Sequence, residues 1–326
     1  MAAMLVPAAL AFALALLGLT LLLSSPVRNL ALDRPNERSL HEVPVPRTGG
    51  LAIMAGAAGA LAFLDGREQA PLLLALALAA LSFGDDLFGL APILRFAAHV
   101  AAAAAALFVF PPEVGAAGLV LLLLGIAWFT NLYNFMDGSD GLAGGMAVVG
   151  FGTYAIAGSV AGPAWLPLVC ASVASAAAAF LLFNFHPAKI FMGDAGSVPL
   201  GFLAGALGIA GWQAGSWPLW FPVLVFSPFA VDATFTLSKR LWKREKVWQA
   251  HREHYYQRLV RMGFGHRRTA LAEFALMAAC SAAALLARDA RPEAQAGMLV
   301  FAAVAYVGLA ALIDVRWARD SERDAG

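Results

Sequence analysis

The sequence predicts an all-α, polytopic integral membrane protein with about ten or eleven transmembrane helices. Of its 326 residues, 61% are hydrophobic and 13% are charged, whereas soluble domains carry about 25% charged residues. The mean hydropathy is +0.74. Long apolar runs alternate with short polar loops, and the basic residues gather in every second loop. These observations indicate a single membrane-embedded domain over residues 1–326.

A transmembrane helix needs about 20 apolar residues, and eleven segments reach or approach that length. They cover residues 4–24, 49–64, 71–84, 96–111, 117–133, 145–160, 164–183, 198–212, 216–238, 269–287 and 296–315. The first segment lacks a basic region before its long apolar run, so we expect it to remain uncleaved. Cys170 and Cys280 lie in apolar runs, which favours buried free thiols over a disulfide or a zinc site.

The Lys and Arg residues predict how the helices are oriented. If the loops are numbered from an outside N-terminus, nearly all of the 22 Lys and Arg residues fall in the inner loops and the C-terminal tail. Because positive charge is enriched on the cytoplasmic side, we expect the N-terminus outside and the C-terminus in the cytoplasm. The net charge of +1 gives no reason to expect a nucleic acid as partner.

The unusual polar motifs all fall in predicted inner loops, near residues 25–48, 85–95, 131–144, 184–197 and 239–268. The outer loops are short and carry no comparable pattern. A channel needs polar residues along its whole depth, whereas this chain places them at one end of its apolar segments. The pattern indicates an active site at the cytoplasmic face, and it makes a transporter or a non-catalytic scaffold the weaker alternative.

The acids in these loops suit a magnesium site. Asp85 and Asp86 are adjacent at a span end, and Asp194 lies in the sequence MGDAGS. Asp137 and Asp140 are each followed by a glycine. Mg²⁺ prefers one or two carboxylates, completed by phosphates and water, and Mn²⁺ could replace it. Acidic loops around one metal and a diphosphate suit phosphoryl transfer, which depends on positioning and charge neutralisation.

Basic residues beside the acids would supply countercharge for an anionic substrate, namely Arg95, Lys189 and the run at 239–268. Each motif also has a plain structural explanation. An Asp-Asp pair can be a solvated helix cap, and the stretch with His251 and His254 can be an amphipathic helix on anionic headgroups. DGSDG lacks the alternating oxygens of an EF-hand, and MGDAGS lacks the Lys of a P-loop. Convergence of all the motifs on one face favours the functional interpretation.

Five motifs in order resemble one family of enzymes. DRPNERSLHEVPVPRTGG, GDDLFG, NLYNFMDGSDGLAGG, NFHPAKIFMGDAGS and HREHYYQRL follow the order seen in the polyprenyl-phosphate N-acetylhexosamine-1-phosphate transferases, over about residues 26–268. The resemblance implies transfer of a sugar 1-phosphate from a UDP-N-acetylhexosamine to undecaprenyl phosphate, with release of UMP and with Mg²⁺ as cofactor. It implies a multi-pass protein of the bacterial inner membrane that starts a lipid-linked glycan such as O-antigen.

The resemblance also assigns roles to residues. Asp194 matches the metal-binding aspartate, and Asp85 and Asp86 match the pair that serves the acceptor phosphate, one of them as base or nucleophile. Four positions match those around the nucleoside, with the aromatic ring against uracil: Asn184, Phe191, Asp137 and Asp140. Two histidines match those near the diphosphate and the sugar: His251 and His254. Further candidate substrate contacts in these loops are Asn134, Lys189, Arg47 and Arg95.

Three departures separate the chain from the peptidoglycan branch of the family, the phospho-N-acetylmuramoyl-pentapeptide transferases. HREHYY replaces three consecutive histidines, RTGG replaces TMGG, and Arg95 replaces a lysine, which keeps the charge but changes its geometry. Arg47 is the candidate substitute for a lysine that contacts the nucleotide. We therefore expect the glycan-initiating branch, with UDP-N-acetylglucosamine or a related UDP-N-acetylamino sugar as donor. The peptidoglycan enzyme is the alternative, and the sequence leaves a homodimer open.

Two mechanisms fit this assignment. We favour direct in-line attack by the lipid phosphate on the sugar-bearing phosphate, with Asp85 or Asp86 taking a proton if the lipid phosphate arrives protonated. The alternative is a covalent phosphosugar intermediate on an aspartate. One displacement inverts the configuration at phosphorus and two retain it. In both, a lipid of the inner leaflet and a cytosolic nucleotide sugar meet at the cytoplasmic interface.

Overall fold

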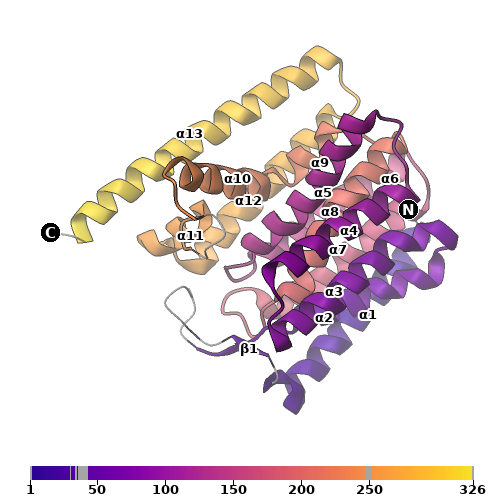
Figure 1. The fold of residues 1–326 in the computed structure, drawn as a ribbon, viewed down its shortest axis with the longest axis horizontal. Helices are drawn as coiled ribbons and strands as arrows, with labels where there is room; N and C mark the ends of the chain where they lie inside the picture. Colours follow the sequence, from indigo (N-terminus) through magenta and orange to yellow (C-terminus); the bar gives the residue numbers. More distant parts are fainter. Residues whose placement is uncertain (1, 30, 34, 36–42, 247–250, 325–326) are drawn as a thin grey trace.

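The computed structural model describes residues 2–29, 31–33, 35, 43–246 and 251–324, which form a bundle of helices (Figure 1). Within these ranges, nine helices are long and apolar enough to cross a membrane. They are α1 (Ala2–Ser24), α3 (Ala70–Phe88), α4 (Pro92–Val109), α5 (Ala116–Phe135), α6 (Leu142–Val160), α7 (Trp165–Asn184), α8 (Asp194–Gln213), α12 (Gly265–Ala287) and α13 (Pro292–Asp324). The prediction of a polytopic helical membrane protein is therefore confirmed.

Two of the eleven predicted spans differ from the expectation. The segment 49–64 forms a short helix, α2 (Gly49–Ala58), that continues into the 3₁₀ turn η2 (Gly59–Phe63). The segment 216–238 is broken at Phe226 into α9 (Trp220–Val225) and α10 (Ser227–Trp242). Pro228 explains the break, because proline lacks the amide proton of an interior helical residue and its ring clashes with the preceding turn.

The remaining elements are short. They are η1 (Pro26–Asn29), η3 (Gly66–Gln69), α11 (Tyr255–Leu259), the π-helical turn η4 (Val260–Phe264), β1 (Leu32–Asp33) and β2 (Val45–Pro46). The two strands pair antiparallel, with Leu32 opposite Pro46 and Asp33 opposite Val45. The all-α prediction is thus wrong for this pair, because two residues per strand are too few to give the alternating pattern by which strands are recognised.

Helix α8 lies at the centre of the bundle and is almost entirely buried. It packs mainly against α3 and α5. A Cβ atom at Gly201 would come within 2.5 Å of the Phe129 carbonyl oxygen, so the glycine allows α5 and α8 to approach closely, as small residues do between membrane helices. This contact brings the end of α5 beside the start of α8, where the polar motifs lie.

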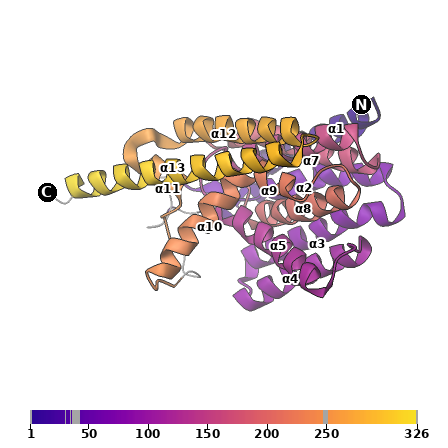
Figure 2. The same ribbon diagram turned by 90° about the horizontal axis from the view of Figure 1, so that it is seen from above.

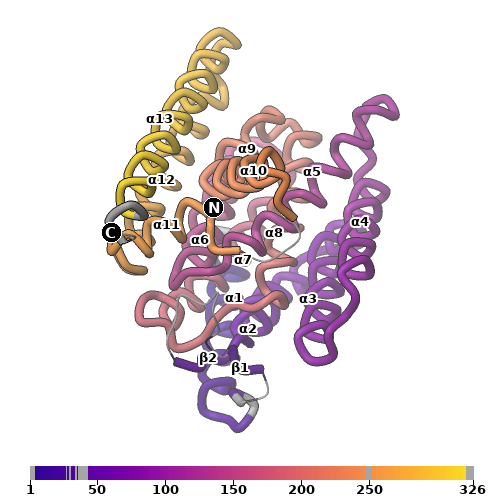
Figure 3. Tube along the Cα trace, turned by 60° about the vertical axis from the view of Figure 1, so that its left-hand side comes forward, coloured from indigo at the N-terminus to yellow at the C-terminus, as the bar shows by residue number. Residues whose placement is uncertain are grey.

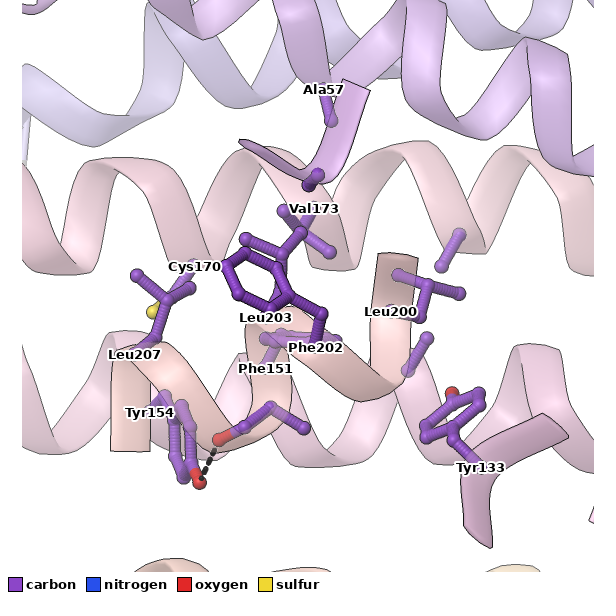
Figure 4. Close-up of a cluster of buried hydrophobic side chains, with 14 of the residues drawn as sticks. Ala57, Tyr133, Phe151, Tyr154, Cys170, Val173, Leu200, Phe202, Leu203 and Leu207 are labelled. Atoms are coloured by element: carbon purple, nitrogen blue, oxygen red, sulfur yellow. Dashed lines mark hydrogen bonds between the residues drawn. The ribbon is translucent and has the colours of Figure 1, made fainter. Parts of the chain in front are cut away.

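The interior around α8 is tightly packed and apolar (Figure 4). Phe151, Phe202 and Leu203 have no exposed surface. The hydroxyl of Tyr154 donates a hydrogen bond to the Ala204 carbonyl at 3.0 Å, as a buried hydroxyl requires. Cys170 lies in this cluster, and Cys170 and Cys280 are both buried and free, which confirms the prediction.

The bundle has a thick centre and two flanking helix pairs. Figure 2 shows α12 and α13 along one side and α3 and α4 along the opposite side, and Figure 3 gives the same order. The N- and C-termini lie at opposite ends of the bundle (Figure 1). The strand pair, the α5–α6 turn and α11 all lie at one end (Figure 1), so the polar motifs are gathered at one end of the spans.

Candidate active site

Two glycine-rich motifs form one layer of backbone at this end of the bundle. Phe191 N donates to the Pro46 carbonyl at 2.7 Å, Gly49 N to the Phe191 carbonyl at 2.9 Å, and Gly50 N to the Met192 carbonyl at 2.8 Å. A Cβ atom at Gly50 would overlap the backbone of Gly196. The RTGG motif therefore lies directly on the MGDAGS motif, which fixes Arg47 and Asp194 as neighbours.

Asp85 lies at the end of α3, where Gly89 (φ +69°) reverses the chain. Its Oδ1 accepts a hydrogen bond from Leu90 N at 2.5 Å, and its Oδ2 is 3.0 Å from Arg95 Nη1. The same Arg95 nitrogen is 3.8 Å from Asp194 Oδ2. Arg95 thus joins two of the predicted acidic motifs, and both Asp85 oxygens already have protein partners.

Asp86 has a different environment from its neighbour. Its Oδ1 lies 3.4 Å from Arg47 Nη1, and its backbone carbonyl accepts a bond from Arg47 Nη2 at 3.2 Å. The side chain is 5% exposed, and Oδ2 has no hydrogen-bond partner within the described residues. A buried carboxylate oxygen without a partner is unfavourable unless a ligand or a proton completes it. Asp86 Oδ2 is therefore able to bind a ligand or to accept a proton.

Asp137 lies in the turn after α5, beside Asp194. Burial raises the pKa of Asp137 well above its usual range, and the carboxylates of Asp194 and Asp33 raise it further, while a backbone hydrogen bond from Gly193 opposes the rise. In the same motif, Asn134 Oδ1 accepts a bond from Ser197 Oγ at 2.7 Å. The structure thus brings together the GDD, MDGSDG and MGDAGS motifs, as expected from the sequence.

The donor atoms at this cluster fit a magnesium ion. They are hard carboxylate oxygens, one of them the unpartnered Asp86 Oδ2, and mutual repulsion around Asp137 would be relieved by a cation. Within the described ranges, no group of three His, Cys, Asp or Glu side chains is placed to hold a metal ion. Mg²⁺ often binds one or two carboxylates and takes its other ligands from phosphates and water, so the residues present suit it.

Asp140 is directed away from this cluster and toward two histidines. Its Oδ2 lies 2.6 Å from His186 Nδ1 and accepts a bond from Ala188 N at 3.2 Å. His266 Nδ1 lies 2.9 Å from Ser139 Oγ. Neither histidine is among the residues predicted from the sequence. His186 lies within the NFHPAKIFMGDAGS motif, but His266 is far along the chain, and the packing of α6 against both α7 and α12 brings the two together.

The Asn184 side chain forms hydrogen bonds with the backbone of two other segments. Its Oδ1 accepts a hydrogen bond from Gly141 N at 2.9 Å, and its Nδ2 donates to the Ile190 carbonyl at 2.9 Å. Asn184 therefore joins the start of α6 to the loop before α8. The Lys189 side chain is exposed in this loop. Phe191, two residues after Lys189, makes the backbone contacts with the RTGG motif described above.

The histidine motif is fixed by an acid that is not predicted from the sequence, Asp232 of α10. Asp232 Oδ1 accepts a bond from Tyr255 N at 2.9 Å and lies 3.2 Å from His254 Nδ1, and its Oδ2 accepts from Tyr256 N at 3.0 Å. A carboxylate at the first amides of α11 stabilises that helix end. This buried acid lies inside the predicted apolar segment 216–238, so the site also draws on a side chain from within a segment and not only on the loops.

The histidine motif also contacts the MDGSDG motif. The His254 and Phe135 rings are stacked with centroids 6.5 Å apart, and Tyr256 OH donates to the Phe135 carbonyl at 3.3 Å. His251 lies beside His254 at 4.9 Å between ring centroids. Burial, with the neighbours His254 and Arg240, lowers the pKa of His251 to about 4, so this ring is neutral at pH 7.

Spans that carry gathered carboxylates and arginines at one end define the class of protein, a multi-pass membrane protein with a charged cluster at one end of its helices. Residues 69–212 match the family described as "Glycosyl transferase family 4". The chain is 30% identical over 279 residues to the "Probable undecaprenyl-phosphate N-acetylglucosaminyl 1-phosphate transferase" of Bacillus subtilis, covering 80% of this chain and 78% of that protein. The chain belongs to this family of polyprenyl-phosphate N-acetylhexosamine-1-phosphate transferases, and it is a transferase.

Two further relatives distinguish the branches of the family. The chain is 31% identical to the "Undecaprenyl-phosphate alpha-N-acetylglucosaminyl 1-phosphate transferase" of Yersinia pestis, covering 72% of this chain and 71% of that protein. Its similarity to the "Phospho-N-acetylmuramoyl-pentapeptide-transferase" of Geobacillus thermodenitrificans is 41% identity over 97 residues, which is 30% of each chain. Similarity over most of the chain therefore lies with the N-acetylglucosaminyl enzymes and not with the peptidoglycan branch.

Proposed function

We propose that this protein transfers an N-acetylhexosamine 1-phosphate from a UDP-sugar to undecaprenyl phosphate and thereby starts a lipid-linked glycan. UDP-N-acetylglucosamine or a related UDP-N-acetylamino sugar is the donor, and UMP is released. The observation that carries the proposal is the convergence of Asp85 and Asp194 on Arg95 at one end of the spans, with Asp137 beside Asp194. The names of the relatives that match over most of the chain support this class of donor and acceptor.

The same end of the bundle faces the cytoplasm in this proposal. The basic stretches of the sequence flank the motifs that lie there, as the positive-inside rule requires of a cytoplasmic side. A polyprenyl phosphate in the inner leaflet of the bacterial inner membrane presents its phosphate at this interface, where a nucleotide sugar arrives from solution. The site therefore lies where the two substrates meet.

The arginines and Asp86 have different roles in the reaction. An oxygen of the lipid phosphate forms a bond to the sugar-bearing phosphorus, and the bond from that phosphorus to UMP breaks, with the electron pair leaving on UMP. Arg47 and Arg95 hold Asp86 and Asp85 in place and add positive charge near the phosphates. Asp86 Oδ2, free of protein partners within the described residues, accepts the proton of a lipid phosphate that arrives protonated.

A magnesium ion would be held by Asp194, with Asp137 and Asp86 nearby, and would supply charge neutralisation for the diphosphate. An aspartyl-phosphosugar intermediate is the alternative to direct attack. Asp85 is the less suitable nucleophile, because Leu90 N and Arg95 occupy both of its oxygens. A donor with a chiral sugar-bearing phosphate separates the two routes, since direct attack inverts the configuration at phosphorus and two displacements retain it.

The direct test is an assay of the purified protein with undecaprenyl phosphate, Mg²⁺ and a panel of labelled UDP-sugars, which includes the peptidoglycan donor. We expect UMP and a labelled lipid with a UDP-N-acetylamino sugar, and loss of both when a chelator is added until Mg²⁺ or Mn²⁺ is restored. Absence of UMP with every donor contradicts the proposal. Turnover of the muramoyl-pentapeptide donor alone assigns the protein to the peptidoglycan branch.

Asp194→Asn and Asp86→Asn test the carboxylates in the same assay. Each should lower kcat by about 10²–10³-fold, the usual loss when one group that stabilises transition-state charge is removed. Asp289→Asn is the matched control, because this acid is 77% exposed and pairs only with its neighbour Arg288 within the described residues. Unchanged kcat in both active-site variants contradicts the assigned roles.

A further inference from the structure

The C-terminal end of α10 carries an exposed surface that is both aromatic and basic. Leu241 and Trp242 are 67% and 91% exposed. Lys243, Arg244 and Lys246 follow them, and all three of these side chains are exposed as well. Within the described residues, none of the three basic side chains takes part in an ion pair. We call these five residues the α10 surface.

The lengths of α9 and α10 place this surface at the edge of a bilayer. Together the two helices run from Trp220 to Trp242. At about 1.5 Å per residue, they are long enough to cross a hydrocarbon layer of about 30 Å. A tryptophan thus lies at each end, as is usual where a span meets the two interfaces. Figure 2 shows α10 running out from the bundle, so its end is open to the headgroup region.

The inner side of the same helix holds the histidine motif. Arg240 is 8% exposed, and its Nη1 lies 2.8 Å from Glu245 Oε2 and 3.1 Å from Glu253 Oε2. Asp232 of the same helix accepts hydrogen bonds from the first amides of α11. His254 is 3% exposed, so it is not available to a membrane surface. Helix α10 therefore contacts the histidine motif on one side and leaves the α10 surface open on the other.

We propose that the α10 surface binds anionic phospholipid headgroups in the leaflet at the active-site end, and that this contact holds the histidine motif in position. Each Lys or Arg near an anionic membrane strengthens binding by about fivefold. The exposed Trp242 and Leu241 favour a bilayer over a nucleotide phosphate, because a free phosphate offers no apolar layer for them to enter. The lipid contact is independent of the proposed function, whereas its effect on turnover rests on it.

Fluorescence in vesicles tests the contact without turnover. The chain has eight tryptophans, so the contribution of Trp242 is the difference in emission between the wild-type protein and Trp242→Phe. Both proteins are reconstituted in mixed phosphatidylcholine and phosphatidylglycerol, with and without bromine near the top of the acyl chains. We expect this difference to fall with brominated lipid, because bromine quenches a ring that lies at the interface. An unchanged difference places Trp242 in water and overturns the proposal.

A lipid titration tests the basic residues and their effect on turnover. Phosphatidylglycerol replaces phosphatidylcholine at a fixed fraction of undecaprenyl phosphate, and UMP release is measured. We expect kcat/KM for the donor to rise about threefold to tenfold in the wild-type protein and less than about twofold in Lys243→Gln/Arg244→Gln. High salt should abolish the rise. Arg316→Gln/Arg319→Gln, two exposed arginines near the end of α13, is the matched control and should rise like the wild-type protein.

The comparison between variants removes one opposing effect. A negative vesicle surface repels the anionic donor and thus lowers its local concentration. This repulsion acts equally on the wild-type protein and on both double variants. The difference in their responses to phosphatidylglycerol therefore reports the α10 surface alone.

The remaining outcomes separate this inference from the proposed function. A wild-type rate that does not change with phosphatidylglycerol overturns the inference. So does an equal loss of the rise in both double variants, which indicates a general effect of surface charge. A raised KM for the donor at every lipid composition in Lys243→Gln/Arg244→Gln assigns these residues to the nucleotide phosphates instead of the headgroups. If the wild-type protein releases no UMP in any lipid, the proposed function fails, while the emission of Trp242 still decides whether the α10 surface meets the bilayer.

Discussion

The two halves of the site are held by different kinds of contact. The acidic half rests on backbone hydrogen bonds between residues 46–50 and 191–192, where glycines allow main chain to meet main chain. The histidine half rests on side chains, with Asp232 holding α11 and Asp314 of α13 holding Arg258 at 2.8 Å. The carboxylates are therefore fixed by the fold itself, whereas the histidine loop depends on a few charged contacts.

The largest effect should come from crowding the backbone layer. Gly50→Ala places a methyl group in the backbone of Gly196, so the RTGG and MGDAGS motifs must separate. We expect a loss of activity of more than about 100-fold, with a loss of stability of about 1–3 kcal/mol from overpacking, read from UMP release and thermal unfolding. Gly125→Ala is the matched control, since nothing lies within 4 Å of its added Cβ. Equal activity in both variants would show that the layer tolerates expansion.

A smaller effect is expected when the histidine half loses its main acid. Asp232→Ala removes the acceptor for Tyr255 N, Tyr256 N and His254. Loss of such a helix cap typically destabilises by about 0.5–2 kcal/mol, and we expect activity to fall about tenfold as His254 moves. Asp232→Asn, which retains one oxygen acceptor, should recover part of both losses. Asp289→Ala serves as control, and wild-type stability in Asp232→Ala would refute this role.

The acidic half is well predicted from the sequence because its signals are local. Asp85, Asp137 and Asp194 each follow or precede an apolar run of membrane length, so their depth in the membrane follows from the positions of the spans. Their sidedness follows from the distribution of Lys and Arg. The glycines beside them indicate close backbone contact. Convergence of these acids on one end of the bundle therefore follows from short stretches of sequence alone.

The histidine half and the contact between His186 and His266 could not be predicted in this way. Asp232 lies inside an apolar run, and only the break at Phe226 and the approach of α11 give it partners. His186 and His266 are 80 positions apart in the sequence, and their contact depends on how α6 packs against both α7 and α12, which has no periodic signal. The β1–β2 pair is likewise too short to give a pattern. Contacts between side chains that depend on tertiary packing cannot be predicted from patterns in the sequence.

A weaker effect should follow when the outer contact of the histidine half is removed. Asp314 pairs with Arg258 and Lys239, but its side chain is 35% exposed, and exposed ion pairs contribute about 0–1 kcal/mol. Asp314→Asn should therefore change kcat and KM for the donor by less than about threefold. Asp320→Asn, on the same helix, is the control. A loss as large as that of Asp232→Ala would mean that α13 is as important to the histidine loop as α10.

The smallest effect concerns the protonation of His251. Its pKa of about 4 arises from burial first, then from His254 and Arg240, with Glu253 and Asp232 opposing. The unfolded chain, with a pKa near 6.5, binds the proton more readily between pH 6.5 and 4, so stability falls as pH falls through this window. His251→Gln removes the contribution of this residue to the loss of stability at low pH. The drop in melting temperature from pH 7.5 to pH 5 should then be smaller than in the wild-type protein, by an amount that partial exposure keeps modest. An identical drop in both proteins would mean that His251 is as well solvated in the fold as in the unfolded chain, which would place the histidine loop outside the buried part of the site.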